Sequence, residues 1–194
     1  GHITEKAPFH GYTDPAKTAS SILENVFEQD DRWFNTGDIM QHMGYRHAQF
    51  VDRTGDTFRW KGENVSTTEV EMLIEEADTV TEAVVYGVEI PNTNGRAGMA
   101  SIRLNRPLEE FDFAHFMQQL RTNMSDYSIP VFLSINQGVE LTGTFKHLKG
   151  PLKEKGFDVR KNTNPLYVRL PKTEIFIPLT QRLQQDIEQG RYRY

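Results

Sequence analysis

The stretch DRTGDTFRWKGENVSTTEV, from Asp52 to Val70, decides the fold of this chain. It joins a turn, a strand end marked by a glycine, and the start of a helix. Ser66 and, three residues later, Glu69 form a capping box, a pattern that supplies hydrogen-bond partners to the first N–H groups of a helix. The apolar residues that follow recur at helical spacing: Val70, Leu73, Ile74 and Ala77. We therefore predict a helix that begins after Ser66.

A turn precedes this helix, at Arg53-Thr54-Gly55-Asp56. It lies between two short runs that contain aromatic and β-branched residues, and Gly55 can adopt the positive φ that a hairpin turn often needs. This placement indicates a pivot between the parts of the chain before and after the turn.

Beyond Phe58, predicted strands and helices alternate regularly. Buried strands are predicted over residues 83–88, 99–104 and 131–135, with a turn at residues 91–95 between the first two. Asp112 is expected to cap a helix whose apolar residues follow the 3.6-residue period: Phe113, Phe116, Met117, Leu120 and Met124. This order predicts an α+β fold, a small sheet of about three strands with helices on its face, preceded by a β-hairpin.

The two ends of the chain differ from this central part. Before about residue 51 the pattern is incomplete, and residues 22–27 predict a short amphipathic helix that short strands and turns follow. After about residue 157 a hairpin is predicted around Pro171-Lys172-Thr173-Glu174, and Thr180 would cap a last helix that ends before Gly190. We expect this hairpin-helix extension to pack on the domain rather than to fold alone.

Composition narrows the range of functions. The 194 residues include 22 basic and 27 acidic side chains, an acidic balance that disfavours nucleic acid as a partner. The sequence contains no apolar run long enough to predict a membrane span, and its lack of cysteine excludes disulfides and thiolate metal sites. We therefore expect a cytoplasmic protein that does not bind nucleic acid.

Most of the polar motifs favour solvation over chemistry. His42 and His47 lack the pattern of a metal site, and the adjacent pairs Glu75-Glu76 and Glu109-Glu110 point about 100° apart on a helix, so neither pair can share a proton. We expect no metal site in this chain. The run from Leu141 to His147 differs, because its glycine turn can project the ammonium group of Lys146 into a partner site. On the residues alone, an exposed loop lysine remains the favoured interpretation.

Three segments, taken together and in order, resemble late core motifs of the adenylate-forming superfamily, which includes acyl-CoA synthetases, luciferases and the adenylation domains of peptide synthetases. They are residues 33–38 (WFNTGD), residues 52–69 and residues 142–146 (TGTFK). Within this superfamily the chain is similar to the fatty acid transport protein branch, the very-long-chain acyl-CoA synthetases, at residues 55–65, 98–101, 142–147, 164–167 and 177–180. The resemblance spans nearly all of the chain after about residue 12.

The resemblance implies a fatty acid, ATP and coenzyme A (CoA) as substrates, with an acyl-adenylate formed before the thioester. It implies that residues 1–51 end a large N-terminal AMP-binding domain, that residues 52–56 form the hinge, and that residues 57–194 form a mobile C-terminal domain with an extension from about residue 157. The N-terminal domain is the expected partner and would hold the Mg²⁺ site and the acyl pocket. The fragment alone is therefore expected to be inactive, while the oligomeric state and a peripheral membrane association of the full-length enzyme stay open.

The resemblance also implies roles for single residues. Asp38 matches the aspartate that holds the ribose hydroxyls, and Arg53 matches the arginine that reaches the same ribose. Lys146 matches the catalytic lysine of adenylate formation, and Gly62 matches a small residue beside the path of the pantetheine thiol. The hinge is assigned to Arg53, Thr54, Gly55 and Asp56.

Three positions depart from the pattern of the superfamily. Gly55 stands where the pivot is commonly charged, Asn64 stands where several relatives have arginine, and Phe145 stands where many relatives have glycine before the lysine. Two other functions also remain open at this point. One is a non-catalytic docking module of a fatty acid transport protein, and the other is an adenylation enzyme that loads a carrier protein.

Overall fold

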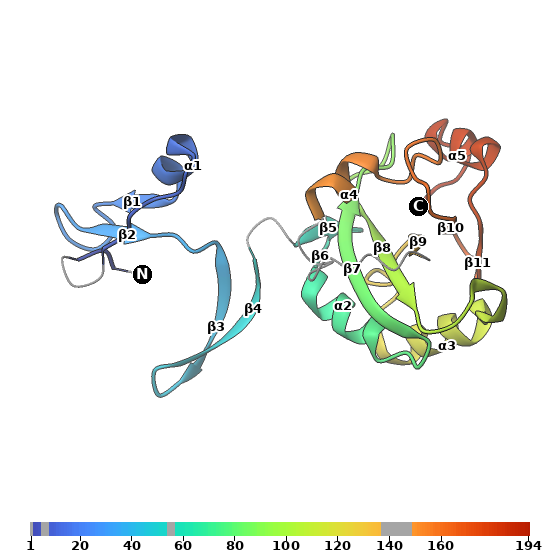
Figure 1. The fold of residues 1–194 in the computed structure, drawn as a ribbon, viewed down its shortest axis with the longest axis horizontal. Helices are drawn as coiled ribbons and strands as arrows, with labels where there is room; N and C mark the ends of the chain where they lie inside the picture. The colour runs from blue at the N-terminus through green and yellow to red at the C-terminus, as the bar shows by residue number, and fades with distance from the viewer. Residues whose placement is uncertain (1, 5–7, 54–56, 137–148) are drawn as a thin grey trace. The chain divides into compact units, whose positions relative to one another are not determined.

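The computed structural model describes residues 2–4, 8–53, 57–136 and 149–194 (Figure 1). The chain divides into two compact units, unit 1 over Gly1–Thr54 and unit 2 over Gly55–Tyr194. The buried hydrophobic cluster of the described residues begins at Phe58 and ends at Ile187, so it belongs entirely to unit 2.

Unit 1 contains a short helix and two antiparallel hairpins. The helix is α1 (Pro15–Ser20). In the first hairpin β1 (Ile22–Glu24) pairs with β2 (Arg32–Phe34), and in the second β3 (Asp38–Gly44) pairs with β4 (His47–Arg53). The second hairpin confirms the prediction of strands and turns in this part of the chain.

The short helix predicted over residues 22–27 is wrong, because residues 22–24 form β1. The loop that follows is organised by Asp31, whose carboxylate accepts hydrogen bonds from the N–H groups of residues 26, 27 and 28 and from the indole of Trp33. Such local acceptors compete with helical hydrogen bonds. Desolvation acts to raise the pKa of Asp31, but these hydrogen bonds outweigh it and lower the pKa to about 2.

Unit 2 opens with a hairpin of β5 (Phe58–Trp60) and β6 (Glu63–Val65), which leads into α2 (Thr67–Glu75). The predicted cap of α2 is confirmed, because the hydroxyl of Ser66 accepts a hydrogen bond from the N–H of Glu69 at 3.2 Å. Residues 54–56 of the predicted turn and pivot lie outside the described residues. Strand β4 pairs with β3 and β5 pairs with β6, so the strands before and after these residues are not partners of each other.

A five-stranded sheet in the order β11-β10-β9-β8-β7 forms the centre of unit 2. Strands β7 (Val80–Val88), β8 (Ala97–Leu104) and β9 (Phe132–Asn136) confirm the three predicted strands. Strands β8 and β9 are parallel, which requires a crossover, and this crossover contains a 3-10 helix (Leu108–Glu110) and α3 (Phe113–Asn123). The carboxylate of Asp112 caps α3 as predicted, by accepting from the N–H groups of residues 114 and 115.

The C-terminal extension belongs to the same sheet. After α4 (Lys149–Lys155), β10 (Leu166–Arg169) pairs with β9 on one side and with β11 (Phe176–Pro178) on the other. Helix α5 (Gln181–Glu188) follows, and its first turn is capped by the hydroxyl of Thr180. The predicted hairpin and last helix are therefore confirmed, and the hairpin adds two strands to the predicted sheet.

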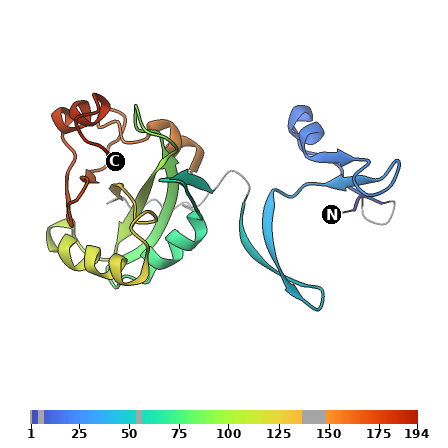
Figure 2. The same cartoon turned by 180° about the vertical axis from the view of Figure 1, so that it is seen from behind.

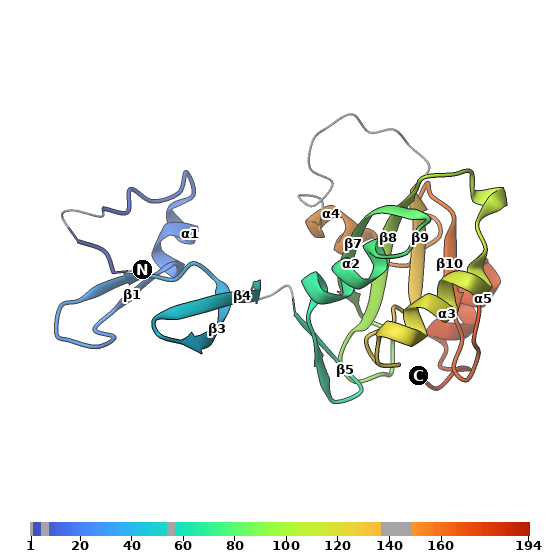
Figure 3. The same ribbon diagram turned by 90° about the horizontal axis from the view of Figure 1, so that it is seen from below.

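Helices cover both faces of the sheet (Figures 1 and 2). Tyr167 and Leu133 are opposite each other on β10 and β9, and the ring of Tyr167 lies 4.4 Å from the ring of Phe113 in α3. The neighbouring residue Phe132 points to the other face, where its ring stacks on Phe157, just beyond α4, at 4.3 Å. Helices α2 and α3 thus lie on one side, as Figure 3 shows from below, and α4 and α5 lie on the other. The structure adds this second layer to the predicted one.

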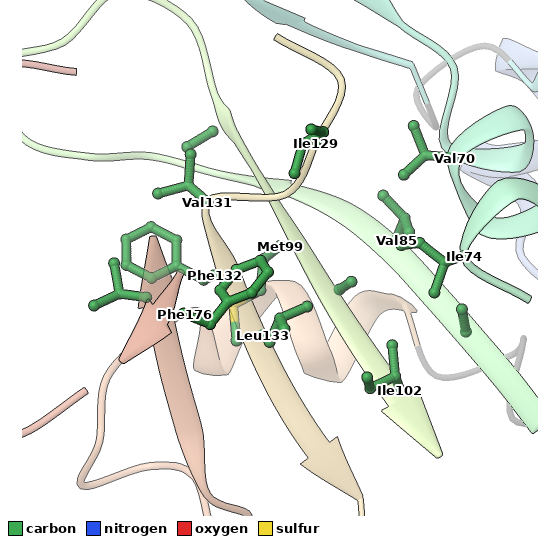
Figure 4. Packing of buried hydrophobic residues seen from close by; sticks show 14 of the residues in the cluster. Val70, Ile74, Val85, Met99, Ile102, Ile129, Val131, Phe132, Leu133 and Phe176 are labelled. Atoms are coloured by element: carbon green, nitrogen blue, oxygen red, sulfur yellow. The ribbon is translucent and has the colours of Figure 1, made fainter. Parts of the chain in front are cut away.

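The buried core fills the space between these layers (Figure 4). Residues 97–102 of β8 and 132–135 of β9 are all buried, which is typical of strands covered on both faces. Figure 4 shows Ile74 of α2 close to Val85 of β7, which fixes α2 along this edge of the sheet. Burial of one such aliphatic side chain contributes about 1.5–3 kcal/mol.

Strand β7 lies at an edge of the sheet, and two glutamates of α2 cover part of its free side. The carboxylate of Glu71 accepts a hydrogen bond from the N–H of Val85 at 2.8 Å, and the carboxylate of Glu75 accepts one from the N–H of Ala83 at 3.0 Å. Four residues of a helix rise about 6 Å, which is close to the length of two strand residues. A single alignment of α2 along β7 therefore allows both glutamates to reach their N–H groups. The interpretation of Glu75 as a solvated side chain is therefore wrong.

Candidate functional site

The second hairpin of unit 1 brings together the two residues that the resemblance assigns to the ribose. Asp38 begins β3, Arg53 ends β4, and the two residues are direct partners in the antiparallel ladder. Direct partners of this kind have Cα atoms about 4.5–5.5 Å apart. The turn before Asp38 is held by local hydrogen bonds, from the N–H of Gly37 to the side chain of Asn35 and from the N–H of Asp38 to the hydroxyl of Thr36.

Gly62 lies in the two-residue loop that joins β5 to β6. Lys61 has φ +51° and Gly62 has φ +88°, and two successive positive φ values define the turn type that best suits a two-residue hairpin. The carbonyl of Gly62 accepts a hydrogen bond from Nε of Arg59 at 3.2 Å. A local requirement for glycine therefore exists at position 62, independent of any substrate.

A close backbone contact fixes this hairpin to the rest of unit 2. The N–H of Arg96 donates to the carbonyl oxygen of Arg59 at 2.7 Å, next to a β-bridge between Trp60 and Gly95. A Cβ atom on Gly95 would collide with the same carbonyl oxygen. Only glycine at position 95 allows this approach, which sets the position of the Lys61-Gly62 loop against β8.

Charged side chains tie the loop to the C-terminal extension. Nζ of Lys61 lies 3.9 Å from Oδ2 of Asp126, and Nη1 of Arg169 in β10 donates to Oδ1 of Asp126 at 2.6 Å. Desolvation acts to raise the pKa of Asp126, but the hydrogen bond from Arg169 and the nearby positive charges outweigh it and hold the pKa below its usual value. Asp126 is therefore a charged link between the hairpin loop and β10.

The other predicted site residues lie wholly or partly outside the described part of the chain. Lys146 lies outside the described residues, as do Thr54, Gly55 and Asp56 of the predicted hinge, and only the main chain of Arg53 is described. The structure thus brings Asp38 and Arg53 together and places Gly62 in a loop of unit 2. The roles of all four, including Lys146, stay predictions.

One polar cluster was missed by reasoning from the sequence. Nζ of Lys149, the first residue of α4, lies 3.1 Å from Oε1 of Glu71 and donates to the hydroxyl of Thr67 at 2.9 Å. A signal for it exists in the predicted helix, because Thr67 and Glu71 are four residues apart and border the apolar face of Val70 and Ile74.

The described residues were also compared with the requirements of metal sites and membrane spans. They contain no group of three or more His, Cys, Asp or Glu side chains placed to hold a metal ion. None of the described helices has the length and apolar character needed to cross a membrane.

Comparison with known proteins finds similarity to AMP-binding enzymes. Residues 69–146 match the AMP-binding enzyme C-terminal domain family. A medium/long-chain-fatty-acid–CoA ligase of Mycobacterium tuberculosis is 43% identical over 191 residues, which cover 97% of this chain and 31% of that protein. Long-chain fatty acid transport protein 6 of Mus musculus is 42% identical over 186 residues, which cover 95% of this chain and 30% of that protein.

Solved structures share the fold. ATP-bound MatB from Rhodopseudomonas palustris matches with a TM-score of 0.62 at 20% identity, over 81% of this chain and 30% of that one. The amide bond synthetase McbA from Marinactinospora thermotolerans matches with a TM-score of 0.58 at 24% identity, over 76% of this chain and 28% of that one. The predicted α+β fold is confirmed, and the chain spans less than a third of the length of the curated relatives it matches.

Proposed function

We propose that this chain forms the C-terminal part of a ligase that joins long-chain or very-long-chain fatty acids to CoA. Its residues 69–146 match the AMP-binding enzyme C-terminal domain family. The observation that carries the proposal is the 43% identity to a fatty acid–CoA ligase across 97% of the chain. ATP and CoA are the proposed co-substrates, and the N-terminal domain of the parent enzyme is the proposed partner.

Two steps make up the proposed reaction. A carboxylate oxygen of the fatty acid attacks the α-phosphorus of ATP, the bond to the β-phosphate oxygen breaks, and acyl-adenylate and pyrophosphate result. The sulfur of CoA then attacks the acyl carbonyl carbon, the bond to the AMP oxygen breaks, and the thiol proton is released. Lys146 is proposed to act in the first step. There its positive charge would stabilise the negative charge that develops between carboxylate and phosphate, which would lower the free energy of the transition state by about 3 kcal/mol.

The hairpin of unit 1 supports the proposed nucleotide contact. Asp38 and Arg53 are ladder partners, so the two positions that the resemblance assigns to the ribose lie opposite each other at this end of the hairpin. The division of the chain between Thr54 and Gly55 falls inside the proposed hinge of residues 53–56. Under the proposal, motion about this hinge removes Lys146 after the first step and presents the loop that contains Gly62 for the second.

A bound Mg²⁺ ion would supply neutralisation of the phosphate charges. We propose that its site lies in the N-terminal domain of the parent enzyme. The resemblance places the acyl pocket in the same domain, so the 194-residue chain alone is proposed to be inactive.

The test measures each half-reaction separately in the parent enzyme. Lys146→Ala is expected to abolish exchange of pyrophosphate into ATP with a fatty acid present, while thioester formation from supplied acyl-adenylate is retained. Lys155→Ala, which changes an exposed lysine of α4, is the matched control and should leave both rates unchanged. Equal loss of both half-reactions in Lys146→Ala would contradict the role of Lys146.

Two further outcomes bear on the alternatives. A parent enzyme without either half-reaction would favour a docking module, and transfer to a carrier protein but not to CoA would favour a carrier-loading enzyme. Adenylate formation by the 194-residue chain alone would contradict the proposal that it is an incomplete part.

A further inference from the structure

The ion pair of Lys149 and Glu71 is largely withdrawn from solvent. The side chain of Glu71 is 5% exposed and that of Lys149 is 17% exposed. Thr67, which accepts a hydrogen bond from Lys149, is fully buried. A buried charge whose partner is removed is costly, so this pair constrains the segments on which it lies.

The pair joins two helices from opposite faces of the sheet. Glu71 lies on α2 and Lys149 begins α4, and the two helices lie on opposite sides in Figures 1 and 3. They meet at the edge strand β7, because the oxygen of Glu71 that contacts Lys149 also accepts the hydrogen bond from the N–H of Val85. The carboxylate thus fixes the ammonium group relative to both α2 and β7.

Apolar packing alone does not hold the start of α4. None of its residues is fully buried, and Leu152 contacts the core only as a partly buried side chain one turn after Lys149. The ion pair with Glu71 and the hydrogen bond to Thr67 are therefore polar contacts that help to hold the first residue of α4.

Covalent geometry connects this contact to the chemistry proposed above. Lys146 precedes Lys149 by three residues, and three residues span at most about 11 Å even when fully extended. We infer that Lys149 is a positioning residue: by its ion pair with Glu71 it anchors the chain just after Lys146 and thereby limits where the catalytic ammonium can lie. This inference rests on the proposed function of Lys146.

Lys149→Met in the parent enzyme tests the inference. The substitution keeps the length of the side chain and removes the charge. Displacement of a reacting group by about 1 Å can reduce a rate by about 100-fold, so we expect adenylate formation to fall by at least about tenfold. Thioester formation from supplied acyl-adenylate should stay within about twofold of the unsubstituted enzyme, since Lys146 is not proposed to act in that step.

A double variant keeps the test valid if Lys149→Met unfolds the protein. Glu71→Gln combined with Lys149→Met removes both buried charges and keeps an oxygen that can accept from the N–H of Val85. The selective loss of adenylate formation is expected to remain in this double variant. Lys149→Arg keeps the ion pair and should restore adenylate formation to within about threefold.

Glu75→Gln is the matched control, because Glu75 makes the equivalent hydrogen bond to the N–H of Ala83 on the same helix. It should leave both half-reactions within about twofold. If the folded double variant keeps full adenylate formation, or loses both half-reactions equally, the inference is overturned. If Lys146→Ala keeps adenylate formation, the proposed function itself fails, so the two failures are distinguishable.

Discussion

Gly62 can be required for either of two physical reasons. The resemblance implies that a side chain there would block the thiol of CoA. The structure gives the residue φ +88°, a backbone conformation that disfavours any residue with a Cβ, and it gives a built Cβ no neighbour within 4 Å among the described residues. The conformational reason therefore acts within this chain, and the steric one would act only in the proposed parent enzyme.

Substitutions at position 62 separate these reasons. Gly62→Ala should lower the free energy of unfolding of the 194-residue chain by about 1 kcal/mol, and Gly62→Asn should lower it less, because asparagine tolerates a left-handed conformation. Urea unfolding measures both. In the parent enzyme, a thiol path blocked by bulk would make asparagine the worse substitution for thioester formation, which is the reverse of the stability order.

Asp126 predicts a dependence of stability on pH. Its pKa is lowered in the folded chain, so its stabilising contribution is present above the unfolded pKa of about 3.9 and is lost as the pH falls through the lower folded pKa. Asp126→Asn should cost about 1 kcal/mol at pH 6, a value reduced because the Asp126 side chain is 63% exposed.

Urea unfolding at pH 6, 4 and 2 checks this prediction. The difference between the unsubstituted chain and Asp126→Asn should shrink as the pH falls below 4. A difference that stays constant down to pH 2 would show that the carboxylate charge is not what stabilises the contact with Arg169.

Among the elements, α3 depends on a single side chain for its first turn. Asp112→Ala removes the acceptor for the N–H groups of residues 114 and 115 and should cost about 1 kcal/mol. Asp112→Asn retains an acceptor and should remain close to the unsubstituted chain. Urea midpoints of the two variants provide the measurement, and equal losses would argue that the negative charge, rather than the cap, stabilises the helix.

Elements with strong local signals were predictable from the sequence. The caps at Ser66 and Asp112 each precede apolar residues at helical spacing, the three central strands are short apolar runs bounded by turn residues, and all are present. The segment of residues 22–27 was not predictable in this way, because apolar spacing over six residues fits a helix or a strand. Its structure is decided by pairing with residues 32–34 and by the acceptor Asp31, both of which lie outside the window.

Contacts between distant segments explain what was missed. The pairing of Lys149 with Glu71 joins residues 78 positions apart, and the local spacing of Thr67 and Glu71 does not identify Lys149 as their partner. Glu75 was also missed, because the sequence shows only two adjacent acidic residues, and its hydrogen bond to Ala83 depends on the position of β7 beside α2. The opposite placement of Asp38 and Arg53, in contrast, follows from a hairpin whose turn residues are local.

For the whole molecule, the C-terminal extension is part of the central sheet. Strand β10 covers the side of β9 that would otherwise be an edge, and Phe157 and Phe176 contribute to the core. A chain that ends at residue 156 should therefore lose cooperative unfolding. Removal of residues 1–53, which lie in unit 1, should leave the protection of β7, β8 and β9 against hydrogen exchange intact.

Hydrogen exchange followed by mass spectrometry compares both truncations. Full protection in the chain that ends at residue 156 would show that the first three strands of the sheet suffice. Loss of protection after removal of residues 1–53 would show that the two units stabilise each other.

The glutamates over β7 also affect how copies of this protein behave toward one another. An exposed edge strand offers its N–H groups to a strand of another molecule, which is a common route to aggregation. At β7 the N–H groups of Ala83 and Val85 are already occupied, and the carboxylates would repel an approaching row of carbonyl oxygens. Since α2 is held in place by Val70 and Ile74, a second sheet could add here only after that helix detached. Protection of this edge of the sheet against association with another sheet thus follows from the packing of one helix.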